Sequence, residues 1–128
     1  MYRAYGLLQP NTSFTLEKGA LQLAARFPDA TVSREGDRIR LIKGEWQIEL
    51  AIADGPQVQS EAEGFAGKIA GLEPQEAAAI ASCSQRIEVD SDVPDPFMEH
   101  FNDFLTVVEV LKSFPGVIVI DPKEPALL

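Results

Sequence analysis

The stretch "TVSREGDRIRLIKGEWQIELAIA", residues 31–53, carries the clearest strand pattern in the chain. The pairs "GD" and "GE" divide it into three short runs, and glycine supplies the positive φ angle that tight hairpin turns require. In the third run the large apolar residues alternate with Gln47, Glu49, Ala51 and Ala53. Such alternation is typical of a half-buried antiparallel strand. We therefore predict a three-strand meander over about residues 30–53, with one face on the core formed by Trp46, Ile48, Leu50 and Ile52.

Helical periodicity flanks the meander on both sides. Residues 15–27 place their apolar side chains on one stripe, because the spacing matches the helical repeat. Thr15 is the expected N-cap, and Pro28 ends the helix because its ring disfavours a helical residue before it. The same reasoning predicts helices from Pro56 or Ser60 to about residue 72, over residues 74–82, and over about residues 96–114.

Three further strands complete the pattern, at residues 2–8, 84–90 and 117–120. The last of them, "VIVI", is apolar throughout, which is typical of a strand covered on both faces. Strands alternating with helices predict one α+β domain over residues 1–128, in which helices pack on one face of a mainly antiparallel sheet. A ferredoxin-like or related split arrangement is the leading architectural hypothesis.

Composition and cysteine usage indicate the compartment. The chain has 128 residues, of which 45% are hydrophobic and 24% charged, as in an ordinary globular domain. Cys83 is the only cysteine, so no internal disulfide can form, which favours a reducing compartment. The first residues lack the apolar segment of a signal peptide, and "VIVI" is too short to span a bilayer. We expect a cytoplasmic protein.

Negative charge is concentrated in the second part of the chain. The formal net charge is −9; residues 1–53 hold seven Lys or Arg against six Asp or Glu, whereas residues 54–128 hold four against fourteen. No Lys or Arg occurs from Ile87 to Leu111. This charge repels nucleic acids and anionic lipids, so we expect neither nucleic acid nor membrane as a partner. It suits a basic protein partner, or it serves only to keep the chain soluble.

The stretch "EVDSDVPDPF", residues 88–97, contains four carboxylates. Asp95 followed by Pro96 is typical of a helix start, because the carboxylate accepts hydrogen bonds from free backbone amides. Asp90 and Asp92 have the spacing of the first two ligands in a helix–loop–helix calcium site. The glycine required at the sixth position and the glutamate required at the twelfth are missing, so the pattern does not predict calcium binding.

A basic partner has an expected binding surface in this part of the chain. Part of the charge is explained by the helix start, while the strand and helix carboxylates have no cation close in sequence. Long-range attraction to such a surface raises the association rate of a basic protein. We predict that the partner contacts Glu88, Asp90, Asp92, Glu99 and Asp103.

One constellation points to chemistry instead. His100 and Asp103 are three residues apart and share a helical surface, and a carboxylate beside an imidazole can tune a general base. Cys83 would be the nucleophile if the fold brought it to His100. A single histidine cannot build a multi-histidine zinc site, and no nucleophile elbow or phosphate-binding loop is present. We predict no catalytic residue, no metal and no cofactor.

Three functional hypotheses follow. The first is a small acidic binding protein without catalytic activity, which neutralises a basic protein partner in the manner of an immunity protein; it rests on size and charge. The second is an enzyme or accessory domain with a site near His100, Asp103 and Cys83. The third is a structural homodimer, joined through the aromatic helix at 96–114 or through a sheet edge.

Overall fold

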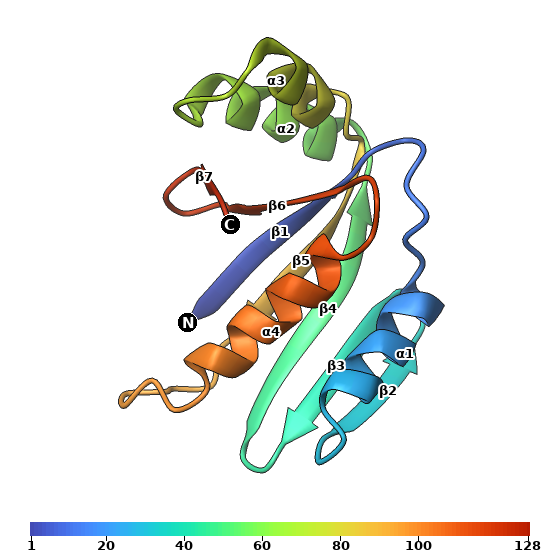
Figure 1. The fold of residues 1–128 in the computed structure, drawn as a ribbon, viewed down its shortest axis with the longest axis vertical. Helices are drawn as coiled ribbons and strands as arrows, with labels where there is room; N and C mark the ends of the chain where they lie inside the picture. The colour runs from blue at the N-terminus through green and yellow to red at the C-terminus, as the bar shows by residue number, and fades with distance from the viewer.

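The computed structural model describes all residues from Met1 to Leu128 and contains four helices beside a seven-stranded sheet (Figure 1). The strands run in the order β2-β3-β4-β5-β1-β6-β7, and all neighbours are antiparallel. The strands are β1 (Tyr2–Leu8), β2 (Thr31–Glu35), β3 (Arg38–Lys43), β4 (Trp46–Asp54), β5 (Gln85–Ser91), β6 (Val117–Asp121) and β7 (Ala126–Leu127). The helices are α1 (Leu16–Arg26), α2 (Pro56–Lys68), α3 (Pro74–Ala81) and α4 (Phe101–Lys112).

A ferredoxin-like split core lies at the centre of this sheet. β1 lies between β5 and β6, which are themselves joined through α4. β5 in turn lies between β1 and β4, which are joined through α1 and the β2–β3 hairpin. Each of the two units, β1 to β4 and β5 to β6, therefore has one strand inserted between the two strands of the other. The β2–β3 hairpin extends the sheet beyond β4. The predicted α+β class and its mainly antiparallel sheet are therefore confirmed.

The main core lies between one sheet face and the helices α1 and α4. Trp46 and Leu50 are each 1% exposed and Ile48 is fully buried, which confirms three residues of the predicted inner face of the meander. The fourth, Ile52, packs against the same core but is only half-buried. The two turns of the meander are tight, because Gly36 and Gly44 take φ angles of 61° and 62° at the first central position. The sequence pattern of residues 31–53 thus fixes both the turns and the buried face.

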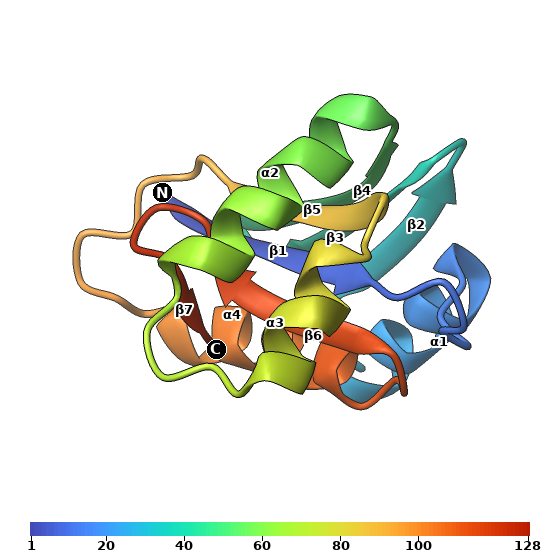
Figure 2. The same cartoon turned by 90° about the horizontal axis from the view of Figure 1, so that it is seen from above.

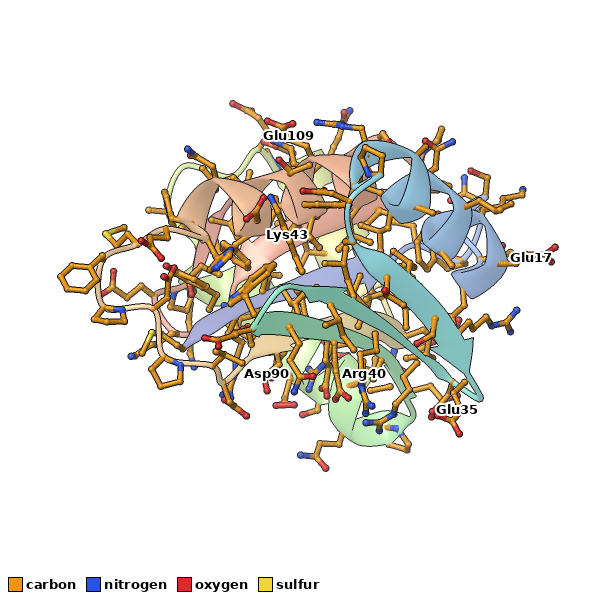
Figure 3. All side chains as sticks on the ribbon, turned by 90° about the horizontal axis from the view of Figure 1, so that it is seen from below. Glu17, Glu35, Arg40, Lys43, Asp90 and Glu109 are labelled. Atoms are coloured by element: carbon orange, nitrogen blue, oxygen red, sulfur yellow. The ribbon has the colours of Figure 1, made fainter.

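Helices α2 and α3 cover the opposite face, whereas the prediction placed all helices on one face. Figure 3 shows α2 on the other side of the sheet from α1 and α4. The physical reason is a second set of apolar residues, because Leu7 and Ile120 point away from the main core and still need cover. They are fully buried in a smaller cluster that also contains Ala62, Ile69, Ile80 and Cys83.

Local sequence signals set most helix starts, with one exception. The Thr15 hydroxyl accepts from the Lys18 amide at 3.1 Å, as predicted, and α2 begins at Pro56. α4, however, begins at Phe101 and not at residue 96. Met98 has a φ angle of 55°, and a right-handed helix cannot pass through such a residue. None of the four helices has the length and hydropathy needed to cross a bilayer.

We expect Leu50→Ala to lower the free energy of unfolding by about 2–5 kcal/mol, because it leaves a cavity in the main core. Leu21→Ala is the matched control: Leu21 is 66% exposed, so the same truncation should change stability by no more than about 0.5 kcal/mol. Urea unfolding followed by tryptophan fluorescence measures both. Equal effects of the two substitutions would mean that the face of β4 is assigned incorrectly.

Candidate binding surface

The loop between β5 and α4, residues 92–100, projects from the body of the molecule (Figures 1 and 2). We call it the β5–α4 loop. Phe97 is 84% exposed and its neighbour Met98 is 58% exposed. Single exposed apolar residues are common on protein surfaces, whereas these two are adjacent and form a small continuous apolar surface on a projecting loop.

Asp95 holds this loop in place. Its side chain is nearly buried and accepts three hydrogen bonds: from the Tyr2 hydroxyl at 2.6 Å and from the amides of Glu99 and His100 at 3.0 and 2.9 Å. The amide of Met98 donates to the backbone carbonyl of Asp95 at 3.0 Å, closing a turn around the exposed residues. Because Tyr2 belongs to β1, these bonds attach the loop to the centre of the sheet.

The same hydrogen bonds set the charge states of the pair. Burial alone would raise the pKa of Asp95, but the hydrogen bonds from Tyr2, His100 and Glu99 outweigh burial and lower it. The hydrogen bond to Asp95 raises the pKa of Tyr2 to about 12, with burial and the negative charge of the carboxylate adding to the effect. An ionised Asp95 and a neutral Tyr2 are therefore the stable combination.

The five acids predicted to contact a partner do not form one surface. Glu88 and Asp90 lie on the sheet face that α2 partly covers, while Asp103 lies on α4 at the opposite face. Figure 3 shows Asp90 and Lys43, the cation paired with Asp103, on opposite sides of the sheet. Asp92 and Glu99 are the two that lie on the β5–α4 loop.

Ion pairs within the chain engage most of this charge. Asp92 keeps a side chain that is 80% exposed, although the N-terminal amine lies 3.7 Å away. Glu99 is exposed and takes part in none of the ion pairs. The other three acids are paired by side chains: Arg86–Glu88 at 2.7 Å, Arg3–Asp90 at 3.2 Å and Lys43–Asp103 at 3.0 Å.

A hollow of about 360 Å³ adjoins the β5–α4 loop on the sheet face that carries Asp90. Glu49 lies opposite Asp90 in the β4–β5 register. Arg40 pairs with Glu49 at 2.6 Å from β3, on the side of β4 away from Asp90. The hollow therefore presents carboxylates, while the balancing arginines lie outside its wall. Its lining residues are Gln47, Glu49, Asp90, Asp92, Val93 and Pro94.

The structure brings together two of the three residues proposed for an enzymatic site. His100 Nδ1 lies 2.9 Å from Asp103, and the imidazole stacks on Trp46 with ring centroids 4.9 Å apart. Cys83 is fully buried in the cluster on the opposite face, where burial raises the pKa of its thiol. Cys83 is therefore not placed to act with His100. No group of three or more His, Cys, Asp or Glu side chains lies close enough to hold a metal ion.

The exposed pair Phe97 and Met98 was missed by the sequence analysis. The helical spacing of the aromatic residues placed Phe97 on the apolar stripe of the helix that was expected to begin at residue 96. The signal that favours a loop is the presence of Pro94 and Pro96 so close together, since each disfavours a helical residue before it.

No known protein family, curated protein or solved structure matches this chain. The interpretation of the surface therefore depends on its own geometry.

The Tyr2–Asp95 pair makes a titration prediction. In a Tyr5→Phe background Tyr2 is the only tyrosine, and its absorbance titration should have a midpoint near pH 12. Asp95→Asn should move the midpoint towards the ordinary value of about 10, because the charged acceptor is lost.

The stability that this pair contributes has a defined pH window. The stabilisation that comes from neutral Tyr2 is fully present below the unfolded pKa of 10.0 and is lost as pH rises towards 12. The stabilisation that comes from ionised Asp95 is present above the unfolded pKa of 3.8 and is lost as pH falls below it. An unchanged Tyr2 midpoint in Asp95→Asn would show that the hydrogen bond does not form in solution.

Proposed function

We propose that this chain is a non-catalytic binding protein that recognises a basic protein partner through the β5–α4 loop. The observation that carries the proposal is the exposure of Phe97, at 84%, on a loop whose conformation is set by a nearly buried carboxylate. Aromatic side chains supply most of the energy in many interfaces when they fill a pocket on the partner. A loop already held in one conformation loses little entropy on binding.

The charge around Phe97 supports the choice of a basic partner. Asp92 and Glu99 stand on either side of Phe97 in the loop, and both are exposed. Glu49 and Asp90 line the hollow beside the loop, but Arg40 and Arg3 pair with them, so Asp92 and Glu99 carry the charge of this surface that no Lys or Arg pairs. A partner that fits this surface has an apolar pocket for the Phe97 ring, surrounded by Lys or Arg side chains.

The proposal narrows the predicted contact surface. Glu88 and Asp103 form ion pairs within the chain, and contact with a partner would have to break the 2.7 Å pair with Arg86 or the 3.0 Å pair with Lys43. Asp90 is paired in the same way, with Arg3. Direct contacts are therefore assigned to Asp92 and Glu99, and the net charge of −9 supplies the long-range attraction. If this contact covered a functional surface of the partner, it would neutralise the partner as an immunity protein does. The proposed location of the complex is the cytoplasm.

The enzymatic alternative rests on the His100–Asp103 contact alone. Lys43 also binds Asp103, at 3.0 Å, and Trp46 covers one face of the imidazole. The backbone amide of His100 is one of the three donors to Asp95. These contacts favour a role for His100 in supporting the β5–α4 loop.

The first test removes the proposed anchor. Phe97→Ser should leave the thermal unfolding midpoint unchanged, because the ring makes little contact with the core, and should weaken partner binding by about 2 kcal/mol or more, roughly 30-fold. Leu21→Ser is the matched control, since it also removes an exposed apolar side chain.

The partner is sought by affinity capture from native lysate with wild type and both variants, followed by titration of the purified protein. A basic protein bound by wild type and Leu21→Ser but lost by Phe97→Ser supports the proposal. A captured protein that binds Phe97→Ser with unchanged affinity, or the absence of any specific capture, contradicts it.

The second test concerns the charge. Asp92→Asn should lower the association rate constant for the captured partner and reduce its dependence on salt, because an exposed charge acts mainly on diffusional encounter. Asp37→Asn removes a carboxylate from the β2–β3 turn, where 71% of the side chain is exposed against 80% for Asp92, and should have little effect. Stopped-flow measurements from about 10 to about 300 mM salt compare the two. Identical salt slopes for wild type and Asp92→Asn would mean that the loop charge serves solubility only.

A further inference from the structure

The two margins of the sheet differ in how they end. At one margin β6 pairs with the short strand β7, and the Leu128 amide donates to the Val119 carbonyl at 2.9 Å. At the other margin β2 pairs only with β3, and every β2 residue is exposed except the half-buried Val32 (Figure 1). One margin therefore ends in an edge strand of two residues, and the other in an edge strand of five.

The open margin offers a defined set of hydrogen-bonding groups. The two-residue turn at Gly36 and Asp37 makes Glu35 and Arg38 the closing pair of the hairpin. In an antiparallel ladder the bonded pairs alternate, so the amides and carbonyls of Val32 and Arg34 point away from β3. β2 contains no proline and no lysine, and its only charged residues are Arg34 and Glu35, which have opposite signs.

We propose that β2 pairs with β2 of a second copy of this chain, antiparallel and about a two-fold axis near Ser33. In this register Val32 lies opposite Arg34 of the second copy, so the outward donors and acceptors of the two strands match. Glu35 lies opposite Thr31, and no two like charges stand directly opposite one another. The two seven-stranded sheets would then join into one continuous sheet.

Charge opposes a second copy less at this margin than at the acidic part of the surface. Residues 54–128 have a net charge of −10, so two copies repel each other wherever those residues meet. Residues 1–53 have a net charge of +1. Arg38 and Arg40 of β3 pair with Glu49, and Lys43 pairs with Asp103. β2 itself carries only Arg34 and Glu35, which balance. The margin at β2 is therefore where two copies of this acidic chain approach with least repulsion.

The proposal is tested with a substitution that affects only the outward side of β2. Arg34→Pro removes an amide that makes no bond to β3, from an exposed residue, and proline is tolerated at such positions of edge strands. Arg34→Ala is the matched control, because it removes the same side chain and keeps the amide. Sedimentation equilibrium from about 10 μM to about 1 mM measures self-association for all three proteins.

Wild type and Arg34→Ala should rise from 14.0 kDa towards twice that mass with concentration, and Arg34→Pro should dissociate at least about tenfold more readily. Circular dichroism should show the same fold and midpoint for both variants. A wild type that stays at 14.0 kDa throughout, or an Arg34→Pro protein that associates as wild type does, overturns the proposal. Phe97→Ser should associate as wild type does, so the result is independent of the β5–α4 loop.

Discussion

The arrangement depends on the pairing of β1 with both β5 and β6. This strand is buried from both sides: Ala4 and Leu8 face the core under α1 and α4, and Leu7 faces the cluster under α2 and α3. Without β1 the sheet would separate between β5 and β6, and neither helical layer would have a continuous surface to cover. Hydrogen bonding along β1 and apolar burial on its two faces therefore support each other.

The candidate binding surface is attached to the same strand, β1. Tyr2, at the start of β1, donates to Asp95, and its ring stacks on Phe104 of α4 at 5.2 Å. The loop thus obtains its order from a central strand of the sheet, while Phe97 and Met98 at its tip remain in solvent. A rigid base with an exposed apolar tip is the arrangement expected of a preformed recognition element.

The sequence predicted the elements better than their long-range relations. Alternation and glycine turns at residues 31–53 were sufficient for the meander, because turn chemistry and burial act locally. The cover of the second face was not predicted, since Leu7 and Ile120 belong to strands at opposite ends of the chain and their shared face depends on strand order.

The candidate surface was predicted only in part, for the same reason. The acidic segment was identified, but the cations that pair with it were not. Arg3 lies 87 residues from Asp90, and Lys43 lies 60 residues from Asp103. No local sequence pattern predicts ion pairs at such separations, because they form only when the strand register is set.

The position of β1 also has a consequence for synthesis on the ribosome. Tyr5 pairs with Glu88 on one side and with Ile120 on the other, so β1 cannot complete its pairing until β5 and β6 have been synthesised. The meander is closed by local hairpins and can form early, whereas contacts between distant segments form slowly. Until β5 and β6 emerge, β1 exposes apolar side chains on both faces and two unpaired backbone edges. A nascent chain of this topology therefore exposes aggregation-prone apolar surface for longer than one built from local hairpins alone.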